Sequence, residues 1–241
     1  MSGSLGKAFL ITGTQLNVGK TFVAAGLVRL LKERGLNVGV MKPVEVGWPK
    51  EQGEWPHDAE ALRIAAEVDD PLEDVAPYVF NELLAPQLAA DRERNPIELE
   101  HIKECLDRLR SRHQIVLVEG VGGLAVPLDE GQDYTTLAKL CDLPVLLVSN
   151  AHMGTLNSTF LSVFYARAQG LNVLGVIANR QDAALDDPTT STNALMIERM
   201  CDVPVLGVLP FRPEADTMED IVATCRECFD IDRLIGLLEL S

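Results

Sequence analysis

The chain has 241 residues, 47% of them hydrophobic and 24% charged, which is ample material for a folded core. Its formal net charge of -15 gives a surface that repels phosphate backbones and anionic headgroups, so we expect no nucleic acid and no membrane partner. Five scattered cysteines, a polar start and the lack of an apolar run of about 20 residues predict a cytoplasmic protein in a reducing compartment.

Short apolar runs alternate with longer segments of helical period. The predicted strands lie at residues 8–11, 37–41, 115–118, 144–148, 173–177 and 204–209. The predicted helices lie at about 20–34, 57–67, 96–110, 133–141, 154–169 and 191–200. Residues 45–56 are predicted to form a loop. Because the strands are almost continuously apolar, we expect a single α/β domain over residues 1–241, with a mostly parallel central sheet and helices on both faces.

A glycine-rich turn follows the first strand and opens the first helix, over residues 13–21. Five residues separate Gly13 from Gly19, where the usual P-loop pattern has four. Backbone N–H groups of such a turn surround phosphate oxygens, and the helix N-terminus adds a favourable dipole. Lys20 is expected to contact the β- and γ-phosphates and Thr21 to bind Mg²⁺. A plain glycine-rich turn is the alternative, but the strand and helix on either side favour nucleotide binding and the three-layer fold of P-loop NTPases.

Charged side chains follow two further strands. Lys42 ends the second predicted strand, and two lysines meeting at one phosphoryl group would stabilise the charge on its oxygens. Glu119 ends the third strand and enters a glycine-rich turn, the position of a magnesium-holding acid in P-loop enzymes. Asp58 starts a helix, where it is either a helix-capping residue or a metal ligand. We therefore predict a phosphoryl-transfer site with Lys20 and Lys42 as candidate catalytic residues.

The later strands end in polar residues and in a second loop-to-helix junction. Asn179 is placed either to pair with the edge of an adenine or to cap a turn, and residues 210–212 are placed to flank the base. Residues 152–157 form the junction after the fourth strand, where free N–H groups are suited to hold a carboxylate.

Taken in order, these motifs resemble those of the dethiobiotin synthetases, the ATP-dependent carboxylases of biotin synthesis. The resembling stretches are residues 13–21, 41–47, 58–59, 76–78, 118–123, 154–157 and 207–210. The resemblance implies a homodimer that uses ATP, Mg²⁺ and CO₂ to carboxylate a small-molecule diamine, 7,8-diaminononanoate. It also implies ring closure to a cyclic urea through a carbamate and a phosphorylated carbamate.

The resemblance assigns roles to the matching positions. Lys20 and Lys42 would be catalytic, and Thr21, Asp58 and Glu119 would hold Mg²⁺. The residues that would bind ATP are Gly13, Asn17, Val18, Gly19, Lys20, Thr21, Phe22, Asp58, Glu119, Gly120, Val121, Gly122, Asn179, Arg180, Pro210, Phe211 and Arg212. The residues that would bind the substrate are Lys42, Val46, Gly154, Thr155, Leu156 and Asn157, with residues 154–157 receiving its carboxylate across the dimer interface.

The sequence departs from the family pattern in two places. The family usually has Asp-Thr and then a variable, often acidic residue at positions 15–17, where Gln15, Leu16 and Asn17 stand, and Ser or Thr where Val46 stands. Two alternatives follow. One is a related enzyme acting on another small acid, such as a cobyrinate-type amide ligase, although little chain after Arg212 remains for the glutaminase domain that it needs. The other is a non-catalytic ATP-binding regulatory protein, which would have little use for Lys42. ATPases that partition cellular structures carry a lysine at the position of Gln15, so that branch is disfavoured.

Overall fold

The computed structural model describes residues 5–49, 55–180, 189–212 and 217–240. Its central six-stranded sheet has the order β10-β9-β8-β1-β5-β2, with every neighbouring pair parallel. The strands are β1 (Lys7–Gly13), β2 (Val38–Met41), β5 (Ile115–Glu119), β8 (Val145–Asn150), β9 (Val173–Asn179) and β10 (Val205–Leu209). All residues of β2, β5 and β8 are buried, as expected for strands covered on both faces. These strands lie where the apolar runs predict them.

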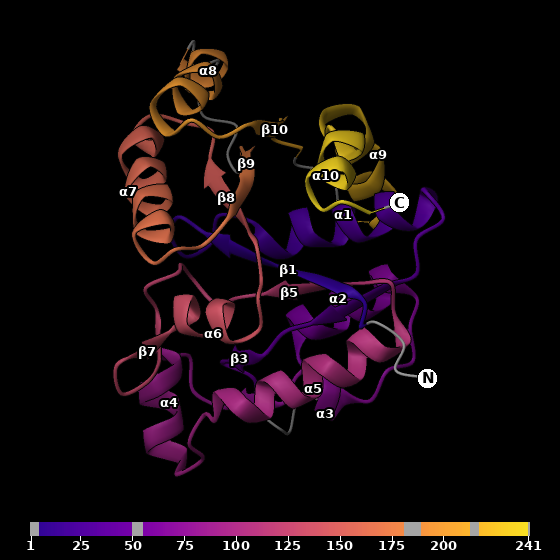
Figure 1. Ribbon diagram of the computed structural model, residues 1–241, viewed down its shortest axis with the longest axis vertical. Helices are drawn as coiled ribbons and strands as arrows, with labels where there is room; N and C mark the ends of the chain where they lie inside the picture. The colour runs from indigo at the N-terminus through magenta and orange to yellow at the C-terminus, as the bar shows by residue number, and fades with distance from the viewer. Residues whose placement is uncertain (1–4, 50–54, 181–188, 213–216, 241) are drawn as a thin grey trace.

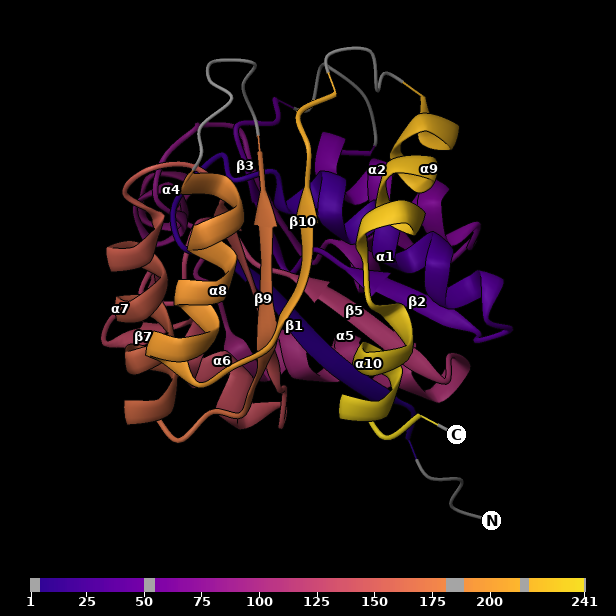
Figure 2. The same ribbon diagram turned by 90° about the horizontal axis from the view of Figure 1, so that it is seen from above.

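Helices cover both faces of the sheet (Figures 1 and 2). On one face α1 packs against β1, β2 and β5, and also contacts α2, α9 and α10. On the other face α5 packs against β2 and β5, and α7 packs against β8 and β9. The helices around this sheet are α1 (Lys20–Glu33), α2 (His57–Ala66), α5 (Leu99–Arg112), α6 (Tyr134–Leu140), α7 (Thr155–Ala168), α8 (Thr189–Cys201), α9 (Met218–Cys228) and α10 (Ile231–Leu237). The predicted three-layer α/β fold is confirmed. In the described part of the chain, no helix has the length and apolar character to cross a bilayer.

Further elements connect these strands and helices. They are β3 (Val44–Val46), β4 (Tyr78–Phe80), β6 (Pro127–Asp129), β7 (Gln132–Asp133), α3 (Leu72–Val75) and α4 (Pro86–Glu93). The prediction of a loop over residues 45–56 was wrong at its start, because Glu45 and Val46 belong to β3, which pairs in parallel with β4. A three-residue strand is too short to show a hydrophobic period, and its partner lies far along the chain. Residues 50–54 of that loop lie outside the described residues.

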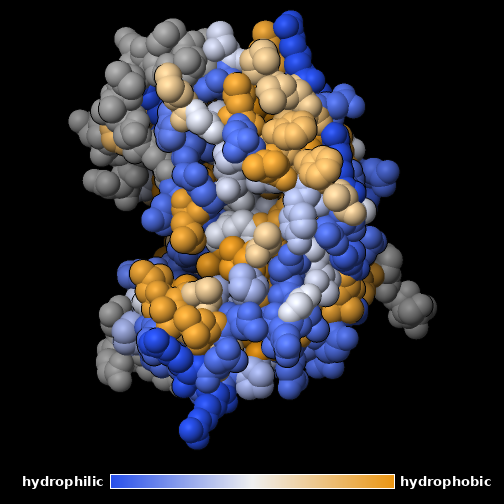
Figure 3. Space-filling view, turned by 90° about the vertical axis from the view of Figure 1, so that its left-hand side faces the viewer, coloured by the Kyte–Doolittle hydropathy of each residue, from blue (hydrophilic) through white to orange (hydrophobic). Residues whose placement is uncertain are grey.

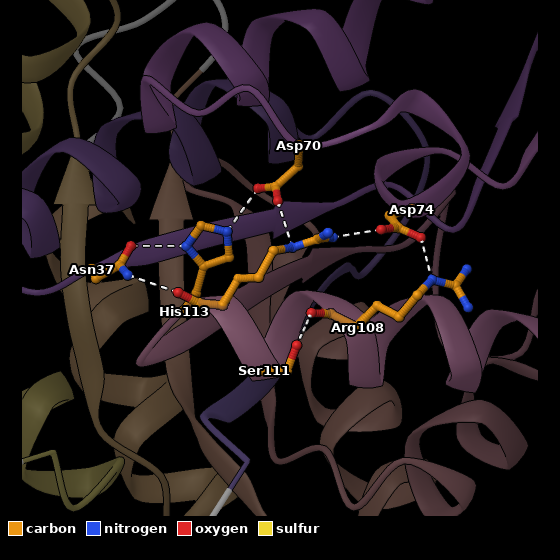
Figure 4. A network of polar contacts seen from close by, with 7 residues as sticks. Asn37, Asp70, Asp74, Arg108, Ser111 and His113 are labelled. Carbon is orange, nitrogen blue, oxygen red and sulfur yellow. Dashed lines mark hydrogen bonds and ion pairs between the residues drawn. The ribbon is translucent and has the colours of Figure 1, made fainter. Parts of the chain in front are cut away.

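A polar network holds the edge strand β2 at its amino end (Figure 4). His113, just before β5, contacts Asn37 Oδ1 through Nδ1 at 2.8 Å and Asp70 Oδ2 through Nε2 at 2.7 Å. Arg112 pairs with Asp70 at 2.9 Å, and Arg108 pairs with Asp74 at 2.6 Å. The network joins the ends of α3 and α5 to the starts of β2 and β5. It therefore fixes the strand whose opposite end leads into Lys42.

Candidate active site

The phosphate loop, residues 13–21, is held at the carboxyl edge of the sheet by backbone hydrogen bonds to the turn after β5 and to β8. The Gly13 N–H donates to the Gly122 carbonyl at 2.9 Å, and the Thr14 N–H donates to the Val148 carbonyl at 2.9 Å. Gly19 precedes α1 with a φ of 79°, a left-handed conformation that glycine adopts without strain. The first N–H groups of α1 have no partner within the helix, so this end of α1 suits an anion.

Three charged residues predicted for the site meet in one cluster, in which Lys42 and Glu119 are buried and Asp58 is partly exposed. Lys42, the residue after β2, is 2% exposed. Its Nζ lies 2.6 Å from Asp58 Oδ2, at the start of α2, and 2.6 Å from Glu119 Oε1, at the end of β5. The Thr21 hydroxyl donates to the same Glu119 oxygen at 2.9 Å. Four side chains from distant parts of the sequence thus converge beside the phosphate loop.

The pKa shifts in this cluster show how closely the charges interact. Burial lowers the pKa of the Lys20 ammonium, and the charge of Lys42 lowers it further. Burial alone would lower the pKa of Lys42 too, but Glu119 and Asp58 outweigh it and hold that pKa well above its usual value. Burial opposes ionisation of Asp58, yet Lys42 holds the pKa of its carboxyl below the ordinary range. The ammonium groups of Lys20 and Lys42 and the carboxylates of Asp58 and Glu119 therefore influence one another's ionisation, and of the two carboxylates only that of Asp58 is partly exposed.

The glycine-rich turn after β5 is braced by a tyrosine that the sequence analysis did not single out. The Tyr134 hydroxyl accepts the Val121 N–H at 3.0 Å, and its ring lies against Gly120, where a Cβ would come within 3.2 Å. Tyr134 is fully buried, and burial raises its pKa to about 12. Gly122 has a φ of 65° and accepts the Gly13 N–H, so this turn and the phosphate loop support each other.

The oxygen atoms around Glu119 fit a magnesium ion. Glu119 is fully buried, and its Oε2 has no hydrogen-bond partner among the described residues, while Oε1 accepts from Thr21 and Lys42. A buried carboxylate oxygen without a partner is costly unless a cation or water satisfies it. Magnesium prefers hard oxygen ligands, usually one or two carboxylates together with phosphate oxygens. The hydroxyl of Thr21 and the carboxylates of Asp58 and Glu119 are such a set.

The residues predicted for the adenine end lie at the carboxyl ends of β9 and β10 or just after them. Asn179 is 6% exposed, and its Nδ2 donates to the Val18 carbonyl of the phosphate loop at 2.9 Å. Arg180 is joined to the end of β10 by its N–H, which donates to the Leu209 carbonyl at 3.0 Å. Arg212 pairs with Glu227 of α9 at 3.3 Å. The described contacts of Asn179 brace the phosphate loop, and its pairing with adenine stays a prediction.

The residues predicted for the substrate lie on two elements at the same edge. Val46, half-buried, ends β3 and pairs with Phe80. Gly154 precedes α7 with a φ of 93°, and in the first turn Thr155 is buried while Asn157 is exposed. Leu16, in the phosphate loop, is 65% exposed. The Thr155 N–H donates to the His152 carbonyl at 3.3 Å, so the next N–H groups of this first turn, those of Leu156 and Asn157, are the ones suited to meet an anion.

A further acid, Glu45, lies beside the cluster and was missed as a site residue. Its Oε1 accepts the Asp58 N–H at 2.9 Å and its Oε2 accepts the Ala59 N–H at 3.1 Å. Its position three residues after Lys42 suggested that it lies near the site. The sequence does not show, however, that β3 and the start of α2 are neighbours.

Several known proteins are similar to this chain. A family model described as an AAA domain matches residues 7–219. The ATP-dependent dethiobiotin synthetase BioD of Bacillus licheniformis is 41% identical over 98% of this chain and 98% of its own length. The protein of the same name from Anaeromyxobacter dehalogenans strain 2CP-1 is 41% identical over 86% of this chain and 92% of its own length.

Solved structures of low sequence identity share the fold. The septum site-determining protein MinD of Pyrococcus horikoshii, complexed with Mg-ADP, has a TM-score of 0.56 at 20% identity, covering 96% of this chain and 95% of that one. The MinC:MinD cell division protein complex of Aquifex aeolicus matches with a TM-score of 0.57 at 15% identity, covering 98% of this chain and 97% of that one. At these identities the likeness concerns the architecture alone.

Proposed function

The chain belongs to the ATP-dependent dethiobiotin synthetase family, and we propose that it converts 7,8-diaminononanoate, CO₂ and ATP into dethiobiotin, ADP and phosphate. It is an ATP-dependent ligase of biotin synthesis. The observation that carries the proposed reaction is the Lys42 ammonium, buried 2.6 Å from both Asp58 and Glu119 and close enough to Lys20 to lower its pKa. A protein that merely held ATP would have no need of this second buried cation.

The proposed reaction has three steps. One amine of the diamine adds to CO₂, forming a carbamate and releasing a proton. A carbamate oxygen attacks the γ-phosphorus of ATP, so that ADP leaves and a carbamoyl phosphate is formed. The second amine then attacks the carbamoyl carbon, phosphate leaves, and the cyclic urea closes with loss of a proton. The ammonium groups of Lys20 and Lys42 stabilise the oxygens on which negative charge builds.

The surrounding residues bind and orient the reactants. The backbone of residues 13–21 holds the phosphates, and Thr21, Asp58 and Glu119 would hold Mg²⁺. Magnesium bound there would neutralise charge on the phosphate oxygens. Residues 179–180 and 210–212 hold the adenine end, and residues 154–157 receive the substrate carboxylate through N–H groups at the start of α7.

The cellular setting is the cytoplasm. All five cysteines are free thiols, which fits a reducing compartment. The net charge of -15 disfavours binding to nucleic acid or to anionic membranes.

Diamine-dependent ADP release tests the reaction. Purified protein is given MgATP, bicarbonate and 7,8-diaminononanoate, and ADP is measured with and without the diamine while the cyclic urea is detected by mass spectrometry. We expect ADP and cyclic urea to form in equal amounts and only when the diamine is present. ADP release that does not depend on the diamine would favour another acid substrate. Tight ATP binding without turnover would favour a regulatory protein.

The homodimer is supported by an apolar face on α7 and α8. On α7, Phe160, Leu161 and Phe164 are 39%, 54% and 62% exposed, and on α8 Leu195 and Met200 are 47% and 42% exposed. Figure 3 shows apolar side chains gathered on this side of the molecule. Monomeric proteins rarely leave such a patch uncovered. Because α7 begins beside residues 154–157, a second subunit packed on this helix would lie beside the proposed carboxylate site, as the family resemblance implies.

Placing a charge on this face should separate the subunits. We expect Phe164→Glu to raise the dimer dissociation constant at least about 30-fold, because burying an unpaired carboxylate costs several kcal/mol. Sedimentation velocity over a range of concentrations measures this shift. Leu237→Glu is the matched control, since Leu237 is a 40% exposed leucine on α10, on the other face of the sheet. An unchanged dimer in Phe164→Glu would place the subunit interface elsewhere.

A further inference from the structure

Glu45 is a buried carboxylate that has no part in the proposed reaction. It is the central residue of β3, is 6% exposed, and has both oxygens occupied by the N–H groups of Asp58 and Ala59. Burial raises the pKa of its carboxyl, while the two N–H donors and the charge of Lys42 oppose that rise. Carboxylates are almost never fully buried unless they are paired. The burial of Glu45 against two backbone N–H groups therefore points to a role for these contacts.

The reason lies in the start of α2, which has no cap of its own. The residue before the helix is Pro56, which offers no side-chain acceptor. The second and third N–H groups of a helix are the ones that a serine, threonine or aspartate at the N-cap usually accepts. Here they belong to Asp58 and Ala59, and Glu45 accepts both from a different element. A negative charge at this place also interacts favourably with the helix dipole.

The cap acts on the residue that faces the proposed metal site. Glu45 binds the backbone of Asp58 at 2.9 Å, while Lys42 binds its side chain at 2.6 Å. Lys42 and Glu45 belong to one short segment, which is anchored by the bond from the Lys42 N–H to the Val75 carbonyl at 2.7 Å and by the pairing of β3 with β4. The segment from Lys42 to Val46 therefore binds Asp58 twice, at its backbone N–H through Glu45 and at its carboxylate through Lys42.

We propose that Glu45 is a positioning residue that fixes the Asp58 carboxylate for metal-bound nucleotide by capping α2. This inference rests on the proposed function, because Asp58 is a metal ligand only there. Glu45 would thus act on metal binding indirectly, through Asp58. This role differs from the stabilisation of the fold that any helix cap provides.

The test compares Glu45→Ala and Glu45→Gln with a cap removed elsewhere. Thr217→Ala is the matched control, since the Thr217 hydroxyl accepts the Asp220 N–H and caps α9, whose described contacts are with α1 and β10. Calorimetric titration of ATP at graded Mg²⁺ concentrations gives the Mg²⁺ concentration that half-maximally tightens binding. Titration in EDTA gives metal-free affinity, and thermal unfolding gives stability.

We expect Glu45→Ala to raise that Mg²⁺ concentration about 10- to 100-fold, the usual effect of losing a residue that orients a metal ligand. The affinity for ATP in EDTA should stay unchanged. Glu45→Gln keeps the side-chain volume and one acceptor oxygen, so its shift should be smaller. Thr217→Ala should lower the unfolding temperature and leave the Mg²⁺ requirement as it is.

The outcomes distinguish a failure of the positioning role of Glu45 from a failure of the proposed metal site. A Glu45→Ala protein with the unfolding loss of Thr217→Ala and an unchanged Mg²⁺ requirement would overturn the positioning role. If Glu45→Ala does not fold, Glu45→Gln decides in the same way: a raised Mg²⁺ requirement in the folded protein supports the role, and an unchanged one overturns it. A wild-type protein that binds ATP without any response to Mg²⁺ would overturn the proposed metal site itself, and this inference with it.

Discussion

Replacing Lys42 with glutamine should lower diamine-dependent ADP release by a factor of about 10²–10³ or more, the usual loss when one preorganised donor to a developing negative charge is removed. The Lys42 ammonium is fixed by Asp58 and Glu119 in a buried position, so it loses little orientational freedom when a phosphate oxygen arrives. Nucleotide affinity should stay largely intact, because Lys20 and the backbone of the phosphate loop still bind the phosphates.

The same substitution should also weaken the fold when Mg²⁺ is absent. Removing one partner of a buried ion pair typically costs about 3–5 kcal/mol, because the other charge is left buried and uncompensated. Glu119 is fully buried, whereas the Asp58 side chain is 40% exposed and partly screened by water, so we expect the lower end of that range. Urea unfolding measures the change, and MgATP should restore part of the lost stability by replacing the missing positive charge.

Lys103→Gln provides the control for both effects. Lys103 pairs with Asp107 on the surface of α5, its side chain is 41% exposed, and such pairs contribute little. Turnover and unfolding free energy should match those of the wild type. Full activity in Lys42→Gln would remove this lysine from the mechanism, and with it the main support for phosphoryl transfer to a small acid.

Much of this site could be predicted because Lys42 and Glu119 lie at the carboxyl ends of buried strands. A strand covered on both faces appears in the sequence as an unbroken apolar run, so its end is easily recognised. In a parallel sheet all the carboxyl ends lie at one edge, which brings Lys42 and Glu119 beside the phosphate loop without further information. The sheet and the convergence of these charges therefore follow from the local sequence and one topological rule.

The supporting residues could not be predicted because their partners are distant in sequence. Glu45 looks like a loop residue until β3 and β4 are seen to pair, and Tyr134 looks like an ordinary core aromatic until its hydroxyl meets the Val121 N–H. For Asn179 the sequence left open whether it pairs with adenine or caps a turn, and the structure shows a bond to the Val18 carbonyl. Each of these contacts depends on the relative placement of two elements, which hydrophobic periodicity does not encode.

Replacing Glu119 with glutamine should produce a different defect from the loss of Lys42. Glutamine keeps the volume of the buried side chain, but it removes the charge that pairs with Lys42 and the carboxylate oxygen that has no partner in the structure. We expect turnover at fixed MgATP to fall about 10²-fold or more, because a metal ligand is lost and the neutral amide oxygen that remains is a weaker acceptor for Thr21 and Lys42. Glu60→Gln is the control, since Glu60 lies on the same helix as Asp58 but pairs with Arg63 at the surface.

The response of ATP binding to Mg²⁺ then distinguishes the role of Lys42 from that of Glu119. ATP binding by the Lys42→Gln protein should still tighten when Mg²⁺ is added, because Thr21, Asp58 and Glu119 all remain. Binding by the Glu119→Gln protein should no longer respond to Mg²⁺ in the same range, while its affinity in EDTA stays close to that of the wild type. Calorimetric titrations of both variants with and without Mg²⁺ measure this contrast. A normal Mg²⁺ response in Glu119→Gln would mean that the buried acid serves only to hold Lys42, and the metal would then have to be bound by other oxygens.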